Sequence, residues 1–431
     1  MGGGAAGTPV PRHHRHLRTA DAPPIRRGRI QRGARPMVAG FHAACGHRPR
    51  FRRATRRAAM DPALLTDPSF WDDPRPVAPG GGLRGLPDLP ELEGHVLFQT
   101  SGSTGTPKWI SLSKSALLLS AACVNRHLRV TEASRWGLAL PLHHVGGFGV
   151  AARCFEAACA CAVFPGRWDA AAFHAWAAEN AITHTSMVPT QVHDLVVAGL
   201  RAPSSLTAIV VGGGRLDGRT GQAARDLGWP VLASYGMTET GSQIATQSPD
   251  LLDTPYQTGD IPLLDIWDAR AGDDGILEVS GPALFSGSLL TDGDGGWIYE
   301  ERRSGWHRTS DKALFQDRLI TPLGRADQVV KVLGELVDPE AIERELASIS
   351  GGALAPGTFA VAAVPDARAE HRLVPLFNRS IDPDLVLNVL REHEIHAPGY
   401  RRLQPPLFVE SIPCSPLGKI LRGGLRKLAG G

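Results

Sequence analysis

The chain has 431 residues, 42% hydrophobic and 21% charged, an ordinary composition for a soluble globular protein long enough for two or three domains. No run of eighteen apolar residues occurs in it, so we expect no transmembrane helix. The net charge of +3 conceals an asymmetry: residues 1–60 hold fourteen Arg and one acid, leaving 32 basic against 42 acidic residues in the rest. This mildly acidic body has no basic stripe, which argues against nucleic-acid binding.

Residues 1–59 form a basic leader rich in Arg, Gly, Ala, Pro and His, without an amphipathic period. Three interpretations are open. The leader is upstream sequence translated from a mis-assigned start, with Met60 or Met37 as the true initiator; or it is a disordered tail that contacts anionic partners; or it is an Arg-rich transit peptide. Under each interpretation the leader stands outside the fold. We then expect a large domain over residues 60–325 and a small mobile domain over residues 326–431.

Strands and helices alternate in the first of these domains, after a Pro- and Gly-rich stretch at residues 61–92 that we expect to wrap over the surface. The pattern predicts strands at 96–98, 136–140, 183–188, 206–211 and 230–234, and helices at 113–126, 170–179 and 190–197. This alternation predicts an α/β fold, a mostly parallel sheet covered by helices on both faces. Ligands of such sheets bind at the carboxyl ends of the strands.

After Gly275 the alternation of strands and helices gives way to short strands, which are predicted at 276–280, 312–315 and 318–321. The second domain begins near Gly324. Its first helix has Asp338 as cap and Pro339 at the first position, and one apolar face made by Ile342, Leu346 and Ile349. Strands near 359–364 and 373–377 and a helix at 384–392 complete a predicted α+β module.

Six cysteines occur, of which Cys154, Cys159 and Cys161 fall in the mostly apolar run 151–164. The run has no C-x-x-C pair and no His at ligand spacing. We therefore expect buried, reduced thiols in the cytoplasm and no zinc site.

The first motif is the stretch Phe-Gln-Thr-Ser-Gly-Ser-Thr-Gly-Thr-Pro-Lys at residues 98–108. Its backbone N–H groups and hydroxyls can surround phosphate oxygens, and the ammonium of Lys108 offsets their charge. It is not a Walker P-loop, because two residues separate Gly105 from Lys108. The alternative, a flexible Ser/Gly linker, does not explain why it directly follows the predicted strand at 96–98.

Four further motifs follow. The stretch 234–240 places Tyr235 and Glu239 just past a strand, and a carboxylate among phosphate-binding hydroxyls is typical of Mg²⁺ binding; a solvated loop acid is the alternative. In 306–311 an acid after a turn can hold ribose hydroxyls. The last two are Gly-Arg-Ala-Asp at 324–327 and the glycine-containing loop of Lys419, which taken singly is an ordinary surface lysine.

In this order and spacing the five motifs resemble those of the AMP-forming adenylating enzymes, which include acyl-CoA synthetases, peptide-synthetase adenylation domains and firefly-type luciferases. The resemblance runs from about Phe98 to Arg422. Within the family, the segments 140–147, 187–190, 211–214 and 234–243 look most like o-succinylbenzoate–CoA ligases of menaquinone synthesis, although related aryl- and acyl-CoA ligases share much of them.

The resemblance implies a reaction in two steps, in which a carboxylate attacks the α-phosphate of ATP and the thiol of coenzyme A then displaces AMP. It also implies three groups of nucleotide-binding residues. They are Thr100, Ser101, Gly102, Ser103, Thr104, Gly105 and Lys108 at the β- and γ-phosphates; Gly212, Gly213, Gly214, Tyr235 and Gly236 around adenine; and Asp311 and Arg325 at the ribose.

The catalytic residues that the resemblance implies are Glu239 holding Mg²⁺, Thr238 at the α-phosphate, Lys419 at the adenylation transition state and His144 in the acyl pocket. A structural His at a strand end is the alternative for His144. Asp327 matches the hinge about which the small domain rotates, withdrawing Lys419 and bringing Gly334 to the pantetheine tunnel. Lys419→Ala should then abolish acyl-adenylate formation and spare thioester formation from supplied adenylate.

Two departures from the family pattern stand out. Ser310 occupies a position where the family favours Gly, and only about forty residues separate Met60 from the phosphate loop. We therefore expect an N-terminally shortened large domain, whose exposed apolar surface a homodimer would cover. The remaining alternatives are a ligase for another carboxylic acid, such as benzoate or a fatty acid, and a nucleotide-binding pseudoenzyme; ATP–pyrophosphate exchange separates them.

Overall fold

The computed structural model describes residues 60–81, 89–100, 108–291, 296–415 and 418–430. The basic leader and residues 101–107 of the phosphate loop lie outside the described residues. Chain contacts place Arg56–Gly431 in one compact unit, so the domain boundary at residues 325 and 326 stays a prediction.

The central element is a six-stranded sheet in the order β4-β3-β5-β6-β7-β8. Its strands are β3 (Arg135–Leu138), β4 (Ala160–Val163), β5 (His184–Met187), β6 (Ala208–Val211), β7 (Val231–Met237) and β8 (Ser242–Thr246). The first five strands are parallel and β8 runs antiparallel to β7. Every residue of β5 and β6 is buried, as expected for strands covered on both faces. The predicted parallel sheet is thus confirmed.

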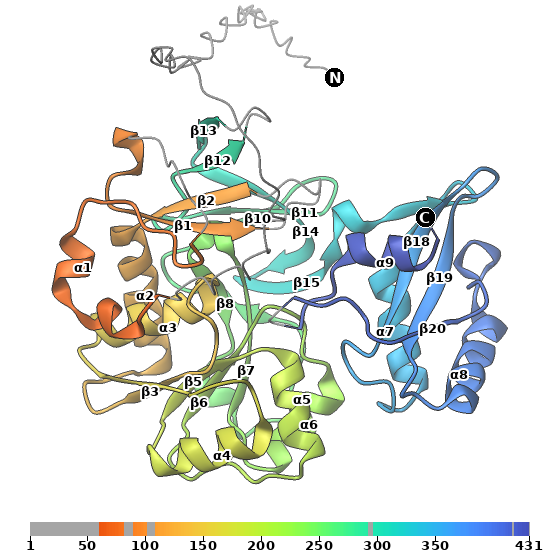
Figure 1. Ribbon diagram of the computed structural model, residues 1–431, viewed down its shortest axis with the longest axis horizontal. Coiled ribbons are helices and arrows are strands. Elements are labelled where there is room, and N and C mark those ends of the chain that lie inside the picture. The colour runs from red at the N-terminus through yellow and green to blue at the C-terminus, as the bar shows by residue number, and fades with distance from the viewer. Residues whose placement is uncertain (1–59, 82–88, 101–107, 292–295, 416–417, 431) are drawn as a thin grey trace, which may run out of the picture. The chain divides into compact units, whose positions relative to one another are not determined.

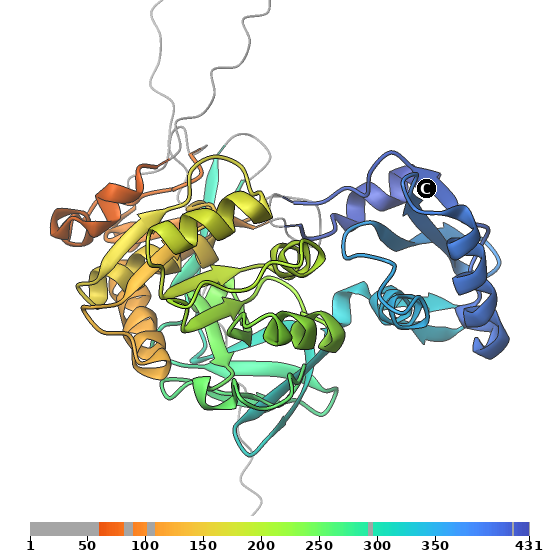
Figure 2. The same cartoon turned by 90° about the horizontal axis from the view of Figure 1, so that it is seen from below.

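Two groups of helices cover this sheet (Figures 1 and 2). They are α2 (Lys114–Leu128) with α3 (Val145–Glu156), and α4 (Ala170–Glu179) with α5 (Pro189–Val197) and α6 (Gly218–Asp226). Side-chain caps start three of them, among them Ser113, whose Oγ accepts from the N–H of Ala116. The sequence did not predict α3 or α6. In α3, three glycines among the first five residues disfavour a helix, but residues 147–154 are buried, so packing decides.

The described residues of the segment 61–92 are mostly exposed or half-buried, as expected of a segment at the surface, but the segment also contains short helices. It forms η1 (Pro62–Thr66), α1 (Pro68–Asp72) and η2 (Pro90–Leu92), which bury Leu65, Trp71 and Leu92. The Trp71 ring stacks on Phe155 of α3 with 5.3 Å between centroids. Apolar burial of this kind ties the segment to the main core.

Two antiparallel sheets complete the first part of the chain. One has the order β1-β2-β12-β13 and consists of β1 (His95–Thr100), β2 (Lys108–Ser113), β12 (Gly287–Thr291) and β13 (Trp297–Glu301). The other has the order β10-β11-β14-β15-β9 and consists of β9 (Ile261–Pro262), β10 (Asp268–Ala271), β11 (Ile276–Ser280), β14 (Trp306–Gln316) and β15 (Leu319–Arg325). The predicted strands are present, and β14 and β15 are longer than expected because the first half of β14 pairs with β11 and its second half pairs with β15.

The C-terminal module has its own apolar clusters. Its elements are β16 (Val330–Val332), β17 (Glu335–Val337), α7 (Pro339–Ile349), β18 (Phe359–Asp366), β19 (Glu370–Asn378), α8 (Pro383–His396), β20 (Leu407–Val409) and α9 (Arg422–Leu428). The predicted α7 is confirmed in detail. Asp338 caps it through the N–H of Glu340, and Ile342 and Leu346 are fully buried. None of the described helices has both the length and the apolar character to cross a membrane.

The expectation of buried thiols holds in part. Cys123 and Cys154 are buried, whereas Cys159, Cys161 and Cys414 are only partly so, and all five thiols are free.

Candidate active site

Two glycine-containing motifs emerge side by side at the carboxyl edge of the parallel sheet. Val211 of β6 lies opposite Ala233 of β7, so Gly212–Gly214 and Ser234–Gly236 continue from adjacent strands. Ser234 Oγ donates to the carbonyl of Val211 at 2.8 Å, and Gly213 has φ +76°, a conformation that favours glycine. The structure therefore places this pair of predicted adenine-binding motifs together.

The prediction that a loop follows residue 234 was wrong. Strand β7 continues to Met237 and pairs with β8, because Gly236 lets the two backbones approach closely. A Cβ at this position would lie 2.0 Å from the carbonyl oxygen of Ser242. Thr238 and Glu239 then form the short turn η3 (Thr238–Thr240) between β7 and β8, and the carbonyl of Glu239 accepts from the N–H of Phe285 at 2.8 Å.

Tyr235 and Asp311 are joined directly. The Tyr235 hydroxyl donates to Asp311 Oδ2 at 2.6 Å. Burial and then the charge of Asp311 raise the pKa of Tyr235 well above its ordinary value. We predicted that Asp311 follows a turn, and that prediction was wrong. Asp311 lies inside β14, where the register with β15 shifts after Lys312. Ser310, at the family's glycine position, is exposed on the same strand and fits without a positive φ.

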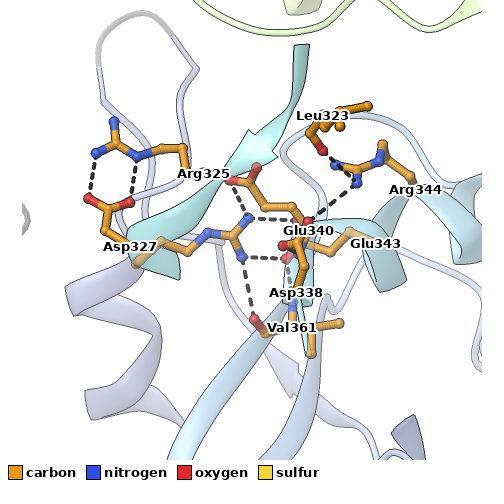
Figure 3. A network of polar contacts seen from close by, with 9 residues as sticks. Leu323, Arg325, Asp327, Asp338, Glu340, Glu343, Arg344 and Val361 are labelled. Carbon is orange, nitrogen blue, oxygen red and sulfur yellow. Dashed lines mark hydrogen bonds and ion pairs between the residues drawn. The ribbon is translucent and has the colours of Figure 1, made fainter. Parts of the chain in front are cut away.

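Arg325 extends this arrangement from the neighbouring strand. It is the register partner of Asp311 and makes a two-pronged ion pair with Asp327, with Nε–Oδ1 at 2.8 Å and Nη2–Oδ2 at 2.5 Å. The hydrogen bonds that Arg325 donates to Asp327 raise the pKa of Arg325. The predicted ribose-binding arginine and the predicted hinge aspartate are therefore paired with each other (Figure 3).

The phosphate side of the site surrounds His307, a residue that the sequence analysis did not single out. Burial lowers the pKa of His307; the charge of Glu239 opposes this shift and that of Lys108 reinforces it. Thr100 pairs with Lys108, and its Oγ1 donates to the Lys108 carbonyl at 3.2 Å. The two ends of the phosphate loop, Thr100 and Lys108, are therefore adjacent in the sheet, while Ser101, Gly102, Ser103, Thr104 and Gly105 lie outside the described residues. The signal for His307 was its place in the motif 306–311.

Glu239 fits a magnesium ion that is bound mainly by a nucleotide. Mg²⁺ usually takes one or two carboxylates together with substrate phosphates and water. In the described part of the chain, no group of three or more His, Cys, Asp or Glu side chains is placed to hold a metal by itself. Glu239 as a single carboxylate therefore suits a Mg²⁺ ion that is also held by the phosphates of a nucleotide.

His144 stands at the start of α3, where it occupies the N-cap position without a side-chain cap bond. Its Nε2 is buried and has no hydrogen-bond partner among the described groups. The ring of His143 lies 4.3 Å away between centroids. Burial and then the proximity of His143 lower the pKa of His144 to about 4, so the ring is neutral at pH 7.

Arg153 is the residue that sequence reasoning missed most clearly. It lies on α3, nine residues after His144, and is 2% exposed. Its guanidinium donates to Ser186 Oγ at 3.2 Å, Ser242 Oγ at 3.3 Å and Gln243 Oε1 at 2.8 Å, and its Nε is buried without a partner. Among the described residues, no carboxylate forms an ion pair with it.

A buried cation held only by neutral groups is costly, and burial lowers the pKa of Arg153 to about 10. The stretch 242–243 that Arg153 contacts directly follows the Tyr235–Glu239 motif. The sequence signal was a charged residue, one of two with Glu156, in the mostly apolar run 151–164.

Lys419 and Gly334 belong to the C-terminal module. Lys419 is exposed on a loop closed by the Ser415 N–H, which donates to the Lys419 carbonyl at 2.7 Å. Gly334 has φ +84°, and its N–H donates to Glu370 Oε2 at 3.2 Å. Among the described hydrogen bonds and ion pairs, none joins either residue to the edge formed by Tyr235, Asp311 and Glu239.

Comparison with known proteins agrees with this geometry. The family model described as AMP-binding enzyme matches residues 63–289, more than half of the chain. The chain therefore belongs to the AMP-binding enzyme family.

Within the family, the chain is 27% identical to the 2-succinylbenzoate–CoA ligase of Bacillus licheniformis, over 66% of this chain and 63% of that protein. It is 29% identical to the 2-succinylbenzoate–CoA ligase of Bacillus cereus, over 59% of this chain and 55% of that protein. The chain thus spans less than two thirds of the length of these curated relatives.

Solved structures share the fold. The o-succinylbenzoate CoA synthetase of Bacillus subtilis, in complex with the acyl-adenylate OSB-AMP, superposes with a TM-score of 0.63 at 24% identity, covering 77% of this chain and 68% of that one. ATP-bound MatB from Rhodopseudomonas palustris gives 0.64 at 24% identity, covering 80% and 69%. These likenesses confirm the mixed α/β fold.

Proposed function

We propose that this chain is an ATP-dependent carboxylate–CoA ligase that works through an acyl-adenylate. The observation that carries the proposal is the half-buried Tyr235–Asp311 hydrogen bond of 2.6 Å. It joins a strand of the parallel sheet to a strand of the antiparallel sheet, next to the phosphate-side group of Glu239 and Lys108. One end of this edge suits adenosine and the other suits a magnesium-bound polyphosphate.

On the adenosine side, the Tyr235 ring and the Gly212–Gly214 backbone would bind the two faces of adenine. Asp311 would accept hydrogen bonds from the ribose hydroxyls, with Arg325 opposite it in the sheet. On the phosphate side, Glu239 would hold Mg²⁺, and Thr238 would contact the α-phosphate. The phosphate loop from Thr100 to Lys108 would bind the β- and γ-phosphates, which leave as pyrophosphate.

The chemistry that these residues support is substitution at phosphorus and then at the acyl carbon. A carboxylate oxygen bonds to the α-phosphorus while the bond to pyrophosphate breaks. The thiolate of coenzyme A then bonds to the acyl carbon and AMP departs. Positioning and charge neutralisation supply most of the catalysis in such reactions. Lys419 would neutralise charge in the first step, and rotation about Asp327 would exchange it for Gly334 in the second.

We infer that the acid is o-succinylbenzoate, the 2-succinylbenzoate of the relatives' names. Arg153 supports this choice, because a buried cation without an acidic partner is best stabilised by an anion that arrives with the substrate. An acid with two carboxylates can present one to ATP and the other to Arg153. Neutral His144, the N-cap of the helix that carries Arg153, would line the acyl pocket.

ATP–pyrophosphate exchange by the purified full chain tests the function. We expect exchange with o-succinylbenzoate, at least tenfold weaker exchange with benzoate, and none with a long-chain fatty acid. Exchange with benzoate alone would support a ligase for another acid. Absence of exchange with every acid would overturn the ligase assignment in favour of a nucleotide-binding pseudoenzyme.

We also infer that the protein acts in the cytoplasm as a homodimer. The free thiols suit a reducing compartment. Exposed apolar side chains such as Val197 and Leu314, 72% and 61% exposed, favour association. Light scattering at the concentration used for the exchange assay tests the dimer, and a monomer mass would contradict it.

A further inference from the structure

Arg422 anchors one end of the loop that carries Lys419. It is the first residue of α9, and two carboxylates of α7 converge on its guanidinium. Its Nη2 donates to Glu343 Oε2 at 2.7 Å and to Glu340 Oε1 at 3.1 Å, while its Nη1 donates to Glu343 Oε1 at 2.5 Å and to the Val361 carbonyl at 3.4 Å. Figure 3 shows Glu340, Glu343 and Val361 around this point.

The same contacts tie three elements together. Glu343 Oε1 also accepts from the N–H of Val361 at 2.6 Å, so the carboxylate links α7, strand β18 and the start of α9. Glu343 is 12% exposed and Arg422 25% exposed at the side chain. Burial raises the pKa of Glu343, and the charge of Arg422 opposes this. Burial would lower the pKa of Arg422, but the two carboxylates raise it above its ordinary value.

The described residues at both ends of the Lys419 loop are fixed by hydrogen bonds. At its start Ile412 is buried, and its N–H donates to Asn378 Oδ1 at 2.9 Å. At its end the N–H of Leu421 donates to the Pro413 carbonyl at 2.8 Å, directly before Arg422. Lys419 itself is exposed, so the direction of its side chain depends on how firmly the base of the loop is held.

We propose that Arg422 is a positioning residue for Lys419, acting through its two-pronged pair with Glu343. This inference rests on the proposed function of Lys419 in adenylation. A guanidinium binds a carboxylate with two parallel N–H···O bonds in a fixed plane, which sets the orientation of the chain only three residues from Lys419. A lysine at this position keeps the positive charge but lacks the planar guanidinium that makes two parallel hydrogen bonds. The loop would then stay attached to Glu343, but its orientation would no longer be fixed.

The structure offers a matched control on the same helix. Arg401 Nη2 donates to Glu345 Oε2 at 2.7 Å, and their side chains are 29% and 33% exposed. This pair also ties a neighbouring segment to α7, but it does not border Lys419 in the chain. Arg401→Lys therefore reproduces the loss of an arginine–glutamate pair without disturbing the base of the loop.

The experiment compares Arg422→Lys, Glu343→Gln and Arg401→Lys in the full chain, with Lys419→Ala as reference. Each variant is assayed for ATP–pyrophosphate exchange and for thioester formation from supplied acyl-adenylate. Displacing a reacting group by about 1 Å can cost about 10²-fold in rate. We expect Arg422→Lys and Glu343→Gln to lower exchange about 10- to 100-fold, with thioester formation within about twofold of wild type. Arg401→Lys should change neither step.

Hydrogen exchange of residues 413–421 gives a second measurement that needs no substrate. We expect faster exchange there in Arg422→Lys and Glu343→Gln, and unchanged exchange in Arg401→Lys. Equal loss of both half-reactions, or equal loss in Arg401→Lys, would overturn the positioning role while leaving the proposed function intact. Wild-type protein inactive with every acid would overturn the function and, with it, the role of Arg422 in adenylation.

Discussion

The nucleotide side and the acid side of the candidate active site differ in whether their charged groups have partners in the protein. On the nucleotide side the two charged groups proposed to bind the ribose have partners: Asp311 accepts from Tyr235, and Arg325 is paired with Asp327. On the acid side Arg153 is fully buried and is held by two hydroxyls and an amide. The proposed ribose-binding groups are therefore satisfied before a ligand binds, whereas the acid side lacks an anion.

This difference has an energetic consequence. A satisfied polar network is rigid and stable in the empty protein. A buried cation without a counter-charge lowers the stability of the empty protein and can recover that free energy when an anion binds. We therefore expect the nucleotide side to set how fast any acid reacts, and the acid side to set which acid reacts.

The largest effect should come from the nucleotide side. Asp311→Ala removes the acceptor for Tyr235 and for the ribose, and should lower kcat/KM for ATP–pyrophosphate exchange about 10²- to 10³-fold. The loss should be the same for o-succinylbenzoate and for any weaker acid. The control is Asp250→Ala, which removes a surface ion pair with Arg129 and should have little effect. If the loss differed between acids, the nucleotide side would also influence which acid reacts, and the proposed division of roles would be wrong.

Arg153→Met tests the acid side and should show a different pattern. Exchange with o-succinylbenzoate should fall about 10²-fold, since loss of one partner of a buried charge pair costs about 2–5 kcal/mol. With a monoester of o-succinylbenzoate that lacks the carboxylate proposed to face Arg153, exchange should be equal in Arg153→Met and in wild type. Without substrate, the melting temperature should be unchanged or higher, because an uncompensated buried charge is removed.

Arg225→Met is the matched control for that variant. The Arg225 guanidinium donates to the carbonyls of Val231, Leu251 and Thr254, so its removal leaves acceptors unpaired. It should lower the free energy of unfolding by about 1–3 kcal/mol without changing acid selectivity. If Arg153→Met destabilised the empty protein as much as Arg225→Met, the acid side would not hold an uncompensated charge.

The pH dependence of stability sharpens the comparison further. The pKa of His144 is about 4 in the folded chain, below the ordinary value of about 6.5. The unfolded chain therefore binds a proton that the folded chain does not, and stability falls as the pH drops from about 6.5 towards 4. Denaturant unfolding should show that His144→Gln removes up to about 3 kcal/mol of this fall. His396→Gln, at an exposed site, should leave the fall unchanged.

The smallest effect is expected for Tyr235→Phe. It keeps the aromatic face for adenine and loses only the hydrogen bond to Asp311. The free energy of unfolding should fall by about 1–2 kcal/mol, in the range for hydrogen bonds to charged groups. The KM for ATP should change less than about tenfold, because Asp311 gains ribose hydroxyls as partners when ATP binds. A larger change in KM would mean that the Tyr235 hydroxyl itself contacts the nucleotide.

Helices and strands were largely predictable where a capping residue or a periodic pattern of apolar residues marks them. Asp338 and Pro339 fixed the start of α7, and the bounds of α4 matched the prediction because Asp169 caps it directly before an alanine-rich run. The prediction failed at α3, whose glycines oppose a helix, and at β7, which extends through Tyr235 because β8 pairs with it. In both places burial or pairing with a distant segment outweighed local propensity.

By itself, the sequence determined the order of the five motifs, and with it the family, since spacing along a chain is a one-dimensional property. Tertiary structure alone decided how their side chains combine. It joins Tyr235 to Asp311 across 76 residues of chain, because strands distant in sequence converge at one edge. It also leaves Arg153 buried without an acidic partner, a fact that depends on every neighbour in three dimensions and that no local pattern of residues records.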